Sequence, residues 1–301
     1  MTAGVVAATL GMIGWAASGV IVKGIDLPAL AIVFWRMSIY AIVIVVVLRL
    51  RARPLTMRGL RISLPGGIAL GLDIMLFFAA VKLTTVANAT VIGAMQPVLL
   101  LAISGPLFGE RPRRSDWLLA AVAMAGVGLV MFGSAGVPEW NLVGDFLALL
   151  TLFAWTAYFI YSKRTRDRID AVEYTAGTAV VATAVAAPVA LLSGQVAELP
   201  QGTMWFWVVM LALGPGFASH ILVNWSLGRI PLWLGSTLTL AIPVASALLA
   251  WMFLGEQLVL AQLAGIVVVT GALAVLVLKP FLGAPVVVVS SEPDERAGST
   301  S

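Results

Sequence analysis

The sequence has no cysteine and one histidine among its 301 residues. Without cysteine there is no disulfide framework, no thiolate metal site and no cysteine nucleophile. The single histidine, His220, excludes a metal site built from several histidines. We therefore expect neither a metal nor another cofactor.

Charged residues are also scarce. They make up 11% of the chain against 61% hydrophobic residues, whereas about a quarter of a soluble domain is charged. Apolar stretches of roughly 20 residues, long enough to cross a bilayer as helices, recur along the chain. The first begins at Thr2 and lacks a basic flank and a cleavage site, which favours a retained span over a signal peptide. The composition indicates an all-α protein embedded in the lipid bilayer.

The apolar stretches predict ten transmembrane helices joined by short loops, with no soluble domain between them. The expected spans are approximately 3–22, 29–48, 64–82, 86–108, 116–133, 143–162, 171–193, 204–227, 232–254 and 260–279. We expect two five-helix repeats, at residues 1–135 and 142–280. Residues 283–301 contain proline, serine and acidic side chains and are expected to form a disordered cytoplasmic tail.

The positions of the basic residues predict an orientation. With a cytoplasmic N-terminus, fifteen Lys and Arg residues fall on the inner side and two fall on the outer side. The positive-inside rule favours this arrangement, with both termini in the cytoplasm. The net charge of +4 then reflects topology, and we expect no nucleic-acid partner. The fifteen are Arg49, Arg51, Arg53, Arg58, Arg61, Arg111, Arg113, Arg114, Lys163, Arg164, Arg166, Arg168, Arg229, Lys279 and Arg296, and the two are Lys23 and Lys82.

Two sequence patterns occur once in each half of the chain. A proline precedes a Gly-Glu pair so that proline and glutamate are 13 residues apart, and a tryptophan precedes a lysine by eight. Because each half has an odd number of spans, matching positions lie on opposite sides of the membrane. The arrangement is a 5+5 inverted-topology repeat, which is typical of secondary transporters. The matched pairs are Pro97 with Glu110 and Pro243 with Glu256, and Trp15 with Lys23 and Trp155 with Lys163.

Glycine and proline interrupt several of the expected spans. Pro97 and Pro243 fall inside spans four and nine, a Pro-Gly-Gly segment opens span three at 65–67, and Gly214-Pro215-Gly216 lies inside span eight. Proline removes a backbone donor and kinks a helix. Interruptions at corresponding places in two repeats indicate a transport pathway, so the matched prolines and residues 214–216 are candidate hinges. Helix packing is the alternative explanation for each of them.

Two ionisable residues lie near the middle of matching spans, Asp73 in span three and His220 in span eight. Phe77 and Asn224 follow them by four residues and share their helix faces. A carboxylate within a membrane span indicates function by default, here binding a substrate cation or a proton. Asp73 alternatively braces a kinked helix, and His220 is equally well explained as a structural residue. Arg36, in span two, either snorkels to the surface or pairs with an acid, and we expect a structural role.

Aromatic residues provide candidate walls for a pocket. Trp15 and Trp155 lie deep in their spans at matching positions of the repeat, and Tyr158 shares a helix face with Trp155. Such residues form walls for a flat or apolar ligand, or simply pack the core. Gln96, beside Pro97, is a candidate hydrogen-bonding group in the same cavity.

These patterns resemble the drug/metabolite transporter superfamily, specifically its members with paired EamA domains. The resemblance rests on the two Pro…Gly-Glu blocks, on Gly14-Trp15 in span one and on Phe34-Trp35-Arg36 in span two, and it covers about residues 3–280. It implies inner-membrane carriers that export amino acids, metabolites or drugs by alternating access. It also implies structural roles for Pro97, Glu110, Pro243 and Glu256. In general character the chain is similar to bacterial exporters of aromatic and hydrophobic amino acids.

We therefore expect a multi-pass inner-membrane exporter of a small molecule. Aromatic or hydrophobic amino acids are the expected substrates, and drugs or other metabolites are the alternative on the same fold. An integral membrane enzyme acting on a lipid-linked substrate is disfavoured, because short loops and the lack of cysteine leave few groups for catalysis. A passive channel is the third alternative, and it would need more polar residues per helix face.

Overall fold

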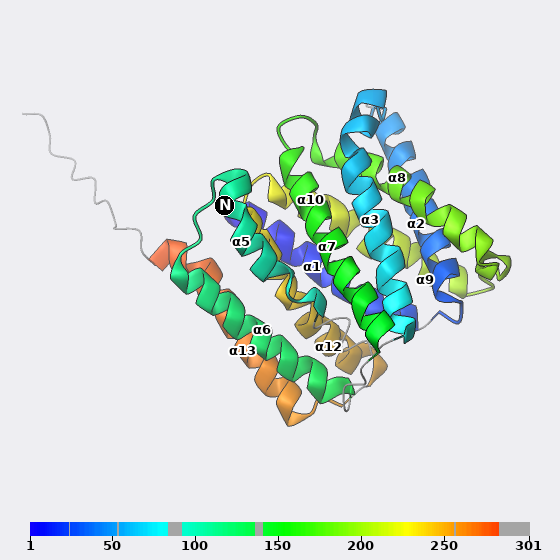
Figure 1. Cartoon of the computed structure of the whole chain (residues 1–301). Helices are drawn as coiled ribbons and strands as arrows, with labels where there is room; N and C mark the ends of the chain where they lie inside the picture. The colour runs from blue at the N-terminus through cyan, green and yellow to red at the C-terminus, as the bar shows by residue number, and fades with distance from the viewer. Residues whose placement is uncertain (24, 53, 84–91, 136–140, 256, 283–301) are drawn as a thin grey trace, which may run out of the picture.

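The computed structural model describes all residues except 24, 53, 84–91, 136–140, 256 and 283–301 (Figure 1). The predicted tail and Glu256 therefore lie outside the described residues. The described part consists of helices and contains no strand. The helices are α1 (Thr2–Lys23), α2 (Ala29–Leu50), α3 (Met57–Leu83), α5 (Gln96–Phe108), α6 (Arg114–Ala135), α7 (Leu142–Arg164), α8 (Ala171–Leu192), α9 (Met204–Leu211), α10 (Ser219–Leu227), α11 (Leu232–Thr237), α12 (Ala241–Leu254) and α13 (Leu260–Leu282), with short 3₁₀ helices at Gln195–Ala197 and Leu238–Leu240 and a π-helix at Ala212–Ala218.

The expected membrane spans are present as helices. Nine of the described segments are long and apolar enough to cross a membrane, including the composite segments Met204–Leu227 and Leu232–Leu254. The shorter α5 ends the remaining expected span, whose earlier residues 84–91 are not described. The described residues thus form an all-α membrane protein, and its nine membrane-length segments together with α5 are consistent with five spans in each half.

The packing of the helices has the symmetry of an inverted repeat. Helix α3 runs along α7, and its counterpart α10 runs along α1. Helix α5 contacts α7, and its counterpart α12 contacts α1, where the hydroxyl of Ser246 donates to the carbonyl of Ala16 at 3.1 Å. The pairs α2 with α8 and α6 with α13 join matching helices to each other, and the contact of α3 with α8 matches that of α9 and the π-helix with α2. These main contacts are arranged as a two-fold axis between the halves requires.

Helices α6 and α13 form a separate pair at the edge of the bundle (Figure 1). Their backbones approach closely where Gly126 faces Gly265: a Cβ added at Gly265 would lie 2.6 Å from the carbonyl oxygen of Gly126. Small residues allow this approach in membranes, where close packing replaces the hydrophobic driving force. At one end of the pair, Lys279 forms an ion pair with Asp116 at 3.0 Å.

The sequence predicted that the Pro-Gly-Gly segment at 65–67 opens span three. In the structure the segment instead lies inside a continuous helix. Helix α3 begins at Met57, earlier than the expected residue 64, and continues through Pro65. Gly66 and Gly67 instead face α8, where added Cβ atoms would collide with Tyr174 and Val181. The two glycines therefore allow α3 and α8 to pack closely, in line with the packing explanation.

Candidate functional site

The two matched tryptophans meet at the interface between the halves. The ring centroids of Trp15 in α1 and Trp155 in α7 are 5.3 Å apart, with their planes at 70°. Residues related by a two-fold axis touch only beside that axis, so this contact places the axis near the two rings. His220 also contacts Trp15, with ring centroids 4.9 Å apart. We call Trp15, Trp155 and His220, with the polar residues around them, the cluster.

A buried hydrogen-bond network adjoins the tryptophans and links three helices. The Tyr158 hydroxyl lies 3.0 Å from Nδ1 of His220 and 3.2 Å from the side-chain oxygen of Asn224. Asn224 also accepts a 2.5 Å hydrogen bond from Ser162 and donates one of 2.9 Å to the hydroxyl of Thr175. Every member of the network is buried. The network joins α7, α8 and α10 at the core of the bundle.

Two opposite charges are buried beside this network. Arg36 in α2 and Asp73 in α3 interact electrostatically with each other, and Asp73 also interacts with Tyr158. Tyr40, one turn after Arg36, stacks on His220 with ring centroids 5.9 Å apart. Arg36 is therefore part of the cluster and does not snorkel to the surface. A charge within a membrane span is rare and marked Arg36 as unusual in the sequence. The sequence did not predict the direction in which its side chain points.

Two further predicted site residues, Phe77 and Gln96, lie in α3 and at the start of α5. Phe77 packs with Ala80, Ala148 and Ile92 in a separate apolar cluster. Gln96 is buried at the start of α5, and neither its amide nitrogen nor its oxygen has a hydrogen-bond partner among the described residues. A buried amide without a hydrogen-bond partner is energetically costly, and the described residues supply no partner for Gln96.

The predicted hinge residues occupy two different structures. Pro97 and Pro243 lie in the first turns of α5 and α12, where a missing N–H costs nothing, rather than at a kink within a helix. In the second half, a 3₁₀ turn at Leu238–Leu240 separates α11 from α12 just before Pro243. The prolines thus begin the second half of an interrupted span.

Residues 214–216 lie in the π-helix between α9 and α10. Pro215 has no N–H to donate and crowds the carbonyl one turn earlier, and the wider π-turn accommodates both effects. The hydroxyl of Ser219 donates to the carbonyl of Gly214 at 3.3 Å. His220 lies two residues after this π-helix, so the irregular turn sets the position of the histidine. The helical segment is irregular here but continuous, and the hinge role of residues 214–216 stays a prediction.

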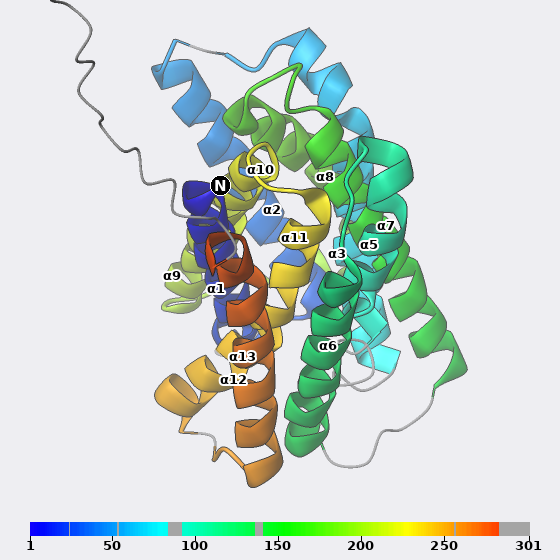
Figure 2. The same cartoon turned by 90° about the vertical axis from the view of Figure 1, so that its left-hand side faces the viewer.

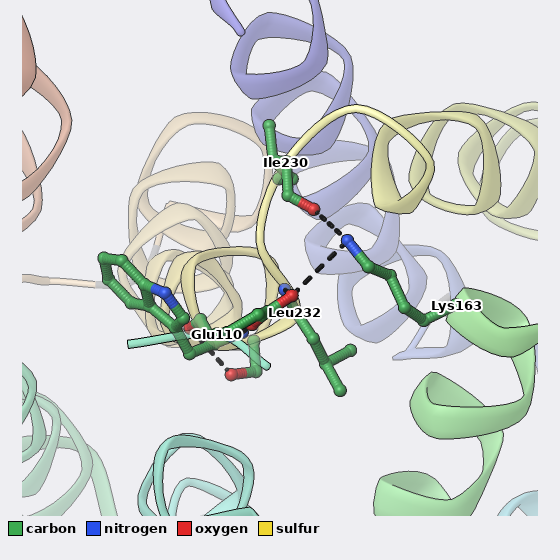
Figure 3. Close-up of polar contacts among 6 residues, drawn as sticks. Glu110, Lys163, Ile230 and Leu232 are labelled. Atoms are coloured by element: carbon green, nitrogen blue, oxygen red, sulfur yellow. Dashed lines mark hydrogen bonds and ion pairs between the residues drawn. The ribbon is translucent and has the colours of Figure 1, made fainter. Parts of the chain in front are cut away.

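Glu110 follows α5 directly after Gly109, and Lys163 lies in the last turn of α7; the two side chains form a clamp (Figure 3). We call this the basic end of the bundle, because the basic residues of segments 111–114 and 163–168 lie here. Their Oε1 and Nζ atoms are 3.4 Å apart, and Lys163 also donates to the carbonyl of Ile230 at 2.6 Å. Glu110 accepts the backbone N–H groups of Leu232 and Trp233 at 2.7 and 3.3 Å. A carboxylate at a helix N-terminus is favourable for the exposed N–H groups and for the helix dipole. This clamp ties α5, α7 and α11 together.

The loop after α7 and the loop between α10 and α11 lie at the same end of the bundle (Figure 2). Arg166 lies against Gly228, and its guanidinium sits 4.6 Å from the centre of the Tyr174 ring. Burial lowers the pKa of Arg166 from its usual value, while the neighbouring Tyr174 opposes the shift. The sequence pattern pointed to Glu110 and Lys163 as repeat positions but did not show that they contact each other.

An open apolar groove of about 700 Å³ lies away from the polar cluster, between α1 and α10. Its lining includes Val6, Leu10, Leu222 and Trp225. Such a surface suits the acyl chains of lipids rather than a polar solute.

Comparison with known proteins gives the family. Both halves match the EamA-like transporter family, over residues 2–132 and 142–278. The chain is 31% identical over 180 residues to the aromatic amino acid exporter YddG of Ancylobacter novellus, covering 58% of this chain and 60% of that protein. It is 27% identical over 168 residues to the pseudopaline exporter CntI of Pseudomonas aeruginosa, covering 54% and 59%. Each alignment thus spans less than two thirds of the exporter.

A solved structure described only as the crystal structure of a protein has the same fold. It superposes with a TM-score of 0.80 over 92% of this chain and 98% of that chain, at 21% identity. The family match in both halves agrees with the duplicated motifs and with the paired packing of the helices. This chain is therefore a member of the EamA-like transporter family, within the drug/metabolite transporter superfamily.

Proposed function

We propose that this protein exports small metabolites, specifically aromatic or hydrophobic amino acids, across the inner membrane by alternating access. The observation that carries the proposal is the cluster at the interface of the halves, where matched tryptophans adjoin a polar network and two buried charges. Aromatic walls suit an apolar side chain, and the polar groups suit its charged head. The names of the relatives YddG and CntI, both exporters, support export as the direction.

In this proposal the substrate contacts Trp15, Trp155, Tyr158, His220, Asn224 and Asp73, and Phe77 and Gln96 line the route beside them. The clamp of Glu110 and Lys163 closes the basic end in the conformation seen here, and both termini face the cytoplasm. Movement at the interruptions before Pro97 and Pro243 and in the π-turn at 214–216 switches access. Substrate then leaves on the other side when the clamp is closed, as alternating access requires.

The test is uptake of labelled amino acids into proteoliposomes, with and without an imposed pH gradient. We expect saturable uptake of aromatic and apolar amino acids by the wild type. Asp73→Asn should lower uptake at subsaturating substrate about tenfold or more, because a hydrogen bond to a charged group contributes about 1.5–3 kcal/mol. A response to the gradient would assign proton coupling.

Equal uptake by wild type and Asp73→Asn, with equal amounts of inserted protein, would remove Asp73 from the site. Flux of drugs or other metabolites without amino-acid flux would favour the alternative substrates on the same fold. Release of a soluble product from a lipid substrate, without any solute flux, would favour an enzyme.

A further inference from the structure

Arg36 and Asp73 are opposite charges that are both buried and yet do not form an ion pair. Arg36 is 9% exposed and Asp73 is 3% exposed. The two side chains interact electrostatically, but among the described residues no ion pair within 4.0 Å includes either of them. Nε of Arg36 and Oδ1 of Asp73 also have no hydrogen-bond partner there. Two buried, oppositely charged side chains that influence each other thus keep polar atoms without a partner among the described residues.

Such an arrangement is unfavourable in a membrane protein unless a bound molecule supplies the missing partners. A buried charge without a partner carries a large desolvation penalty, and two opposite charges normally relieve it by direct contact. Intramembrane charges that are not structural pairs mark the pathway of a substrate or ion. The missing partner must offer an anionic group to Arg36 and a cationic group to Asp73.

The two charges also limit which molecules can bind. A substrate with only an ammonium group would gain from Asp73 but would be repelled by Arg36, and a simple carboxylate would meet the reverse problem. A zwitterion satisfies both groups at once. A guanidinium binds a carboxylate through two parallel hydrogen bonds, and a carboxylate accepts hydrogen bonds from an ammonium.

We propose that Arg36 and Asp73 together bind the head group of a zwitterionic α-amino acid, with the substrate carboxylate on Arg36 and its ammonium on Asp73. This inference rests on the proposed function and specifies its substrate class. His220 lies within the electrostatic reach of Arg36 and its ring contacts that of Trp15, so it joins the head-group site to the aromatic walls. The substrate side chain then lies against Trp15 and Trp155.

The test is competition against uptake of labelled L-phenylalanine in proteoliposomes. Phenethylamine lacks the carboxylate, and 3-phenylpropionate lacks the ammonium. Both should inhibit the wild type at least about tenfold less strongly than unlabelled L-phenylalanine, because each loses a charge-assisted hydrogen bond. Equal inhibition by either analogue would overturn the proposal, and this measurement needs no variant.

Variants assign each charge to its end of the substrate. Arg36→Gln should lose the preference for L-phenylalanine over phenethylamine, and Asp73→Asn should lose the preference over 3-phenylpropionate. Arg229→Gln is the matched control, because Arg229 is exposed and lies over Trp225, away from the cluster. It should keep both preferences. If both Arg36→Gln and Asp73→Asn keep both preferences, the assignment is wrong.

Failure of this inference is distinguishable from failure of the proposed function. A panel of amino acids, organic cations and organic anions separates them by charge. Amino-acid flux without discrimination against phenethylamine or 3-phenylpropionate would overturn the zwitterion site and leave amino-acid export in place. Flux of cations or anions alone would overturn the zwitterion site and favour the alternative substrates on the same fold. No flux of any solute through folded protein would overturn the proposed function itself.

Discussion

Asn224 connects three helices through one side chain, because it bonds to Tyr158 and Ser162 in α7 and to Thr175 in α8. We predict that Asn224→Leu lowers the free energy of unfolding by about 1–3 kcal/mol, since it leaves buried hydroxyl groups without partners. Thermal unfolding in detergent measures the effect. Uptake should fall as well, because the network positions Tyr158 and His220.

Thr156→Val is the matched control for that substitution. Thr156 is buried in α7, but its hydroxyl donates only to the carbonyl of Leu152 in the same helix, at 2.7 Å. We expect a much smaller change in melting temperature for Thr156→Val. Similar losses in the two variants would contradict a special role for the network.

Sequence reasoning identified part of this cluster and missed the rest for a clear reason. Trp15 and Trp155 could be found because they repeat, and Asn224 because it follows His220 by one helical turn. The hydrogen bonds of Ser162 and Thr175 to Asn224 cross between helices, and no local spacing encodes which helices meet. The burial of Arg36 likewise depends on how α2 is rotated in the bundle.

The clamp of Glu110 and Lys163 holds α5, α7 and α11 together, so its loss should affect how the basic end opens. We predict that Glu110→Gln makes this end open more often, because the variant loses the ion pair with Lys163 and weakens the bonds to the start of α11. The absence of native cysteine allows a single reporter, Ser226→Cys, to be labelled without background. Ser226 is buried beside the loop that carries Ile230.

Labelling of this reporter by a water-soluble maleimide should be about tenfold faster with Glu110→Gln than without it, in line with the loss of a charge-assisted bond. Lys279→Met breaks a different ion pair, the one with Asp116, and is the matched control. It should leave the labelling rate unchanged. Equal acceleration by both substitutions would indicate general loosening instead of a clamp.

At the level of helices, hydropathy was sufficient for the number of spans but not for their internal geometry. Apolar stretches located the helices because a lipid environment demands that backbone groups bond within each helix. Proline and glycine, however, carry more than one meaning. At 65–67 they serve close packing against α8, and at 214–216 they form a π-turn, because the neighbouring helices decide which backbone groups find partners.

The molecule as a whole is two inverted halves with the candidate site on the axis between them. The inversion could be predicted because repeated motifs and an odd number of spans together require it. The substrate could not, because the same fold and motifs serve different solutes, as the names of two exporter relatives show. Specificity depends on the few side chains at the interface of the halves.

Counterflow in proteoliposomes tests the central claim most directly. Vesicles are loaded with excess unlabelled L-phenylalanine and diluted into a trace of labelled L-phenylalanine. An alternating-access carrier exchanges one molecule for another, so the account predicts a transient accumulation of label above its equilibrium level inside the vesicles. Uptake that rises only to equilibrium, with no transient excess, would indicate a channel and contradict the account.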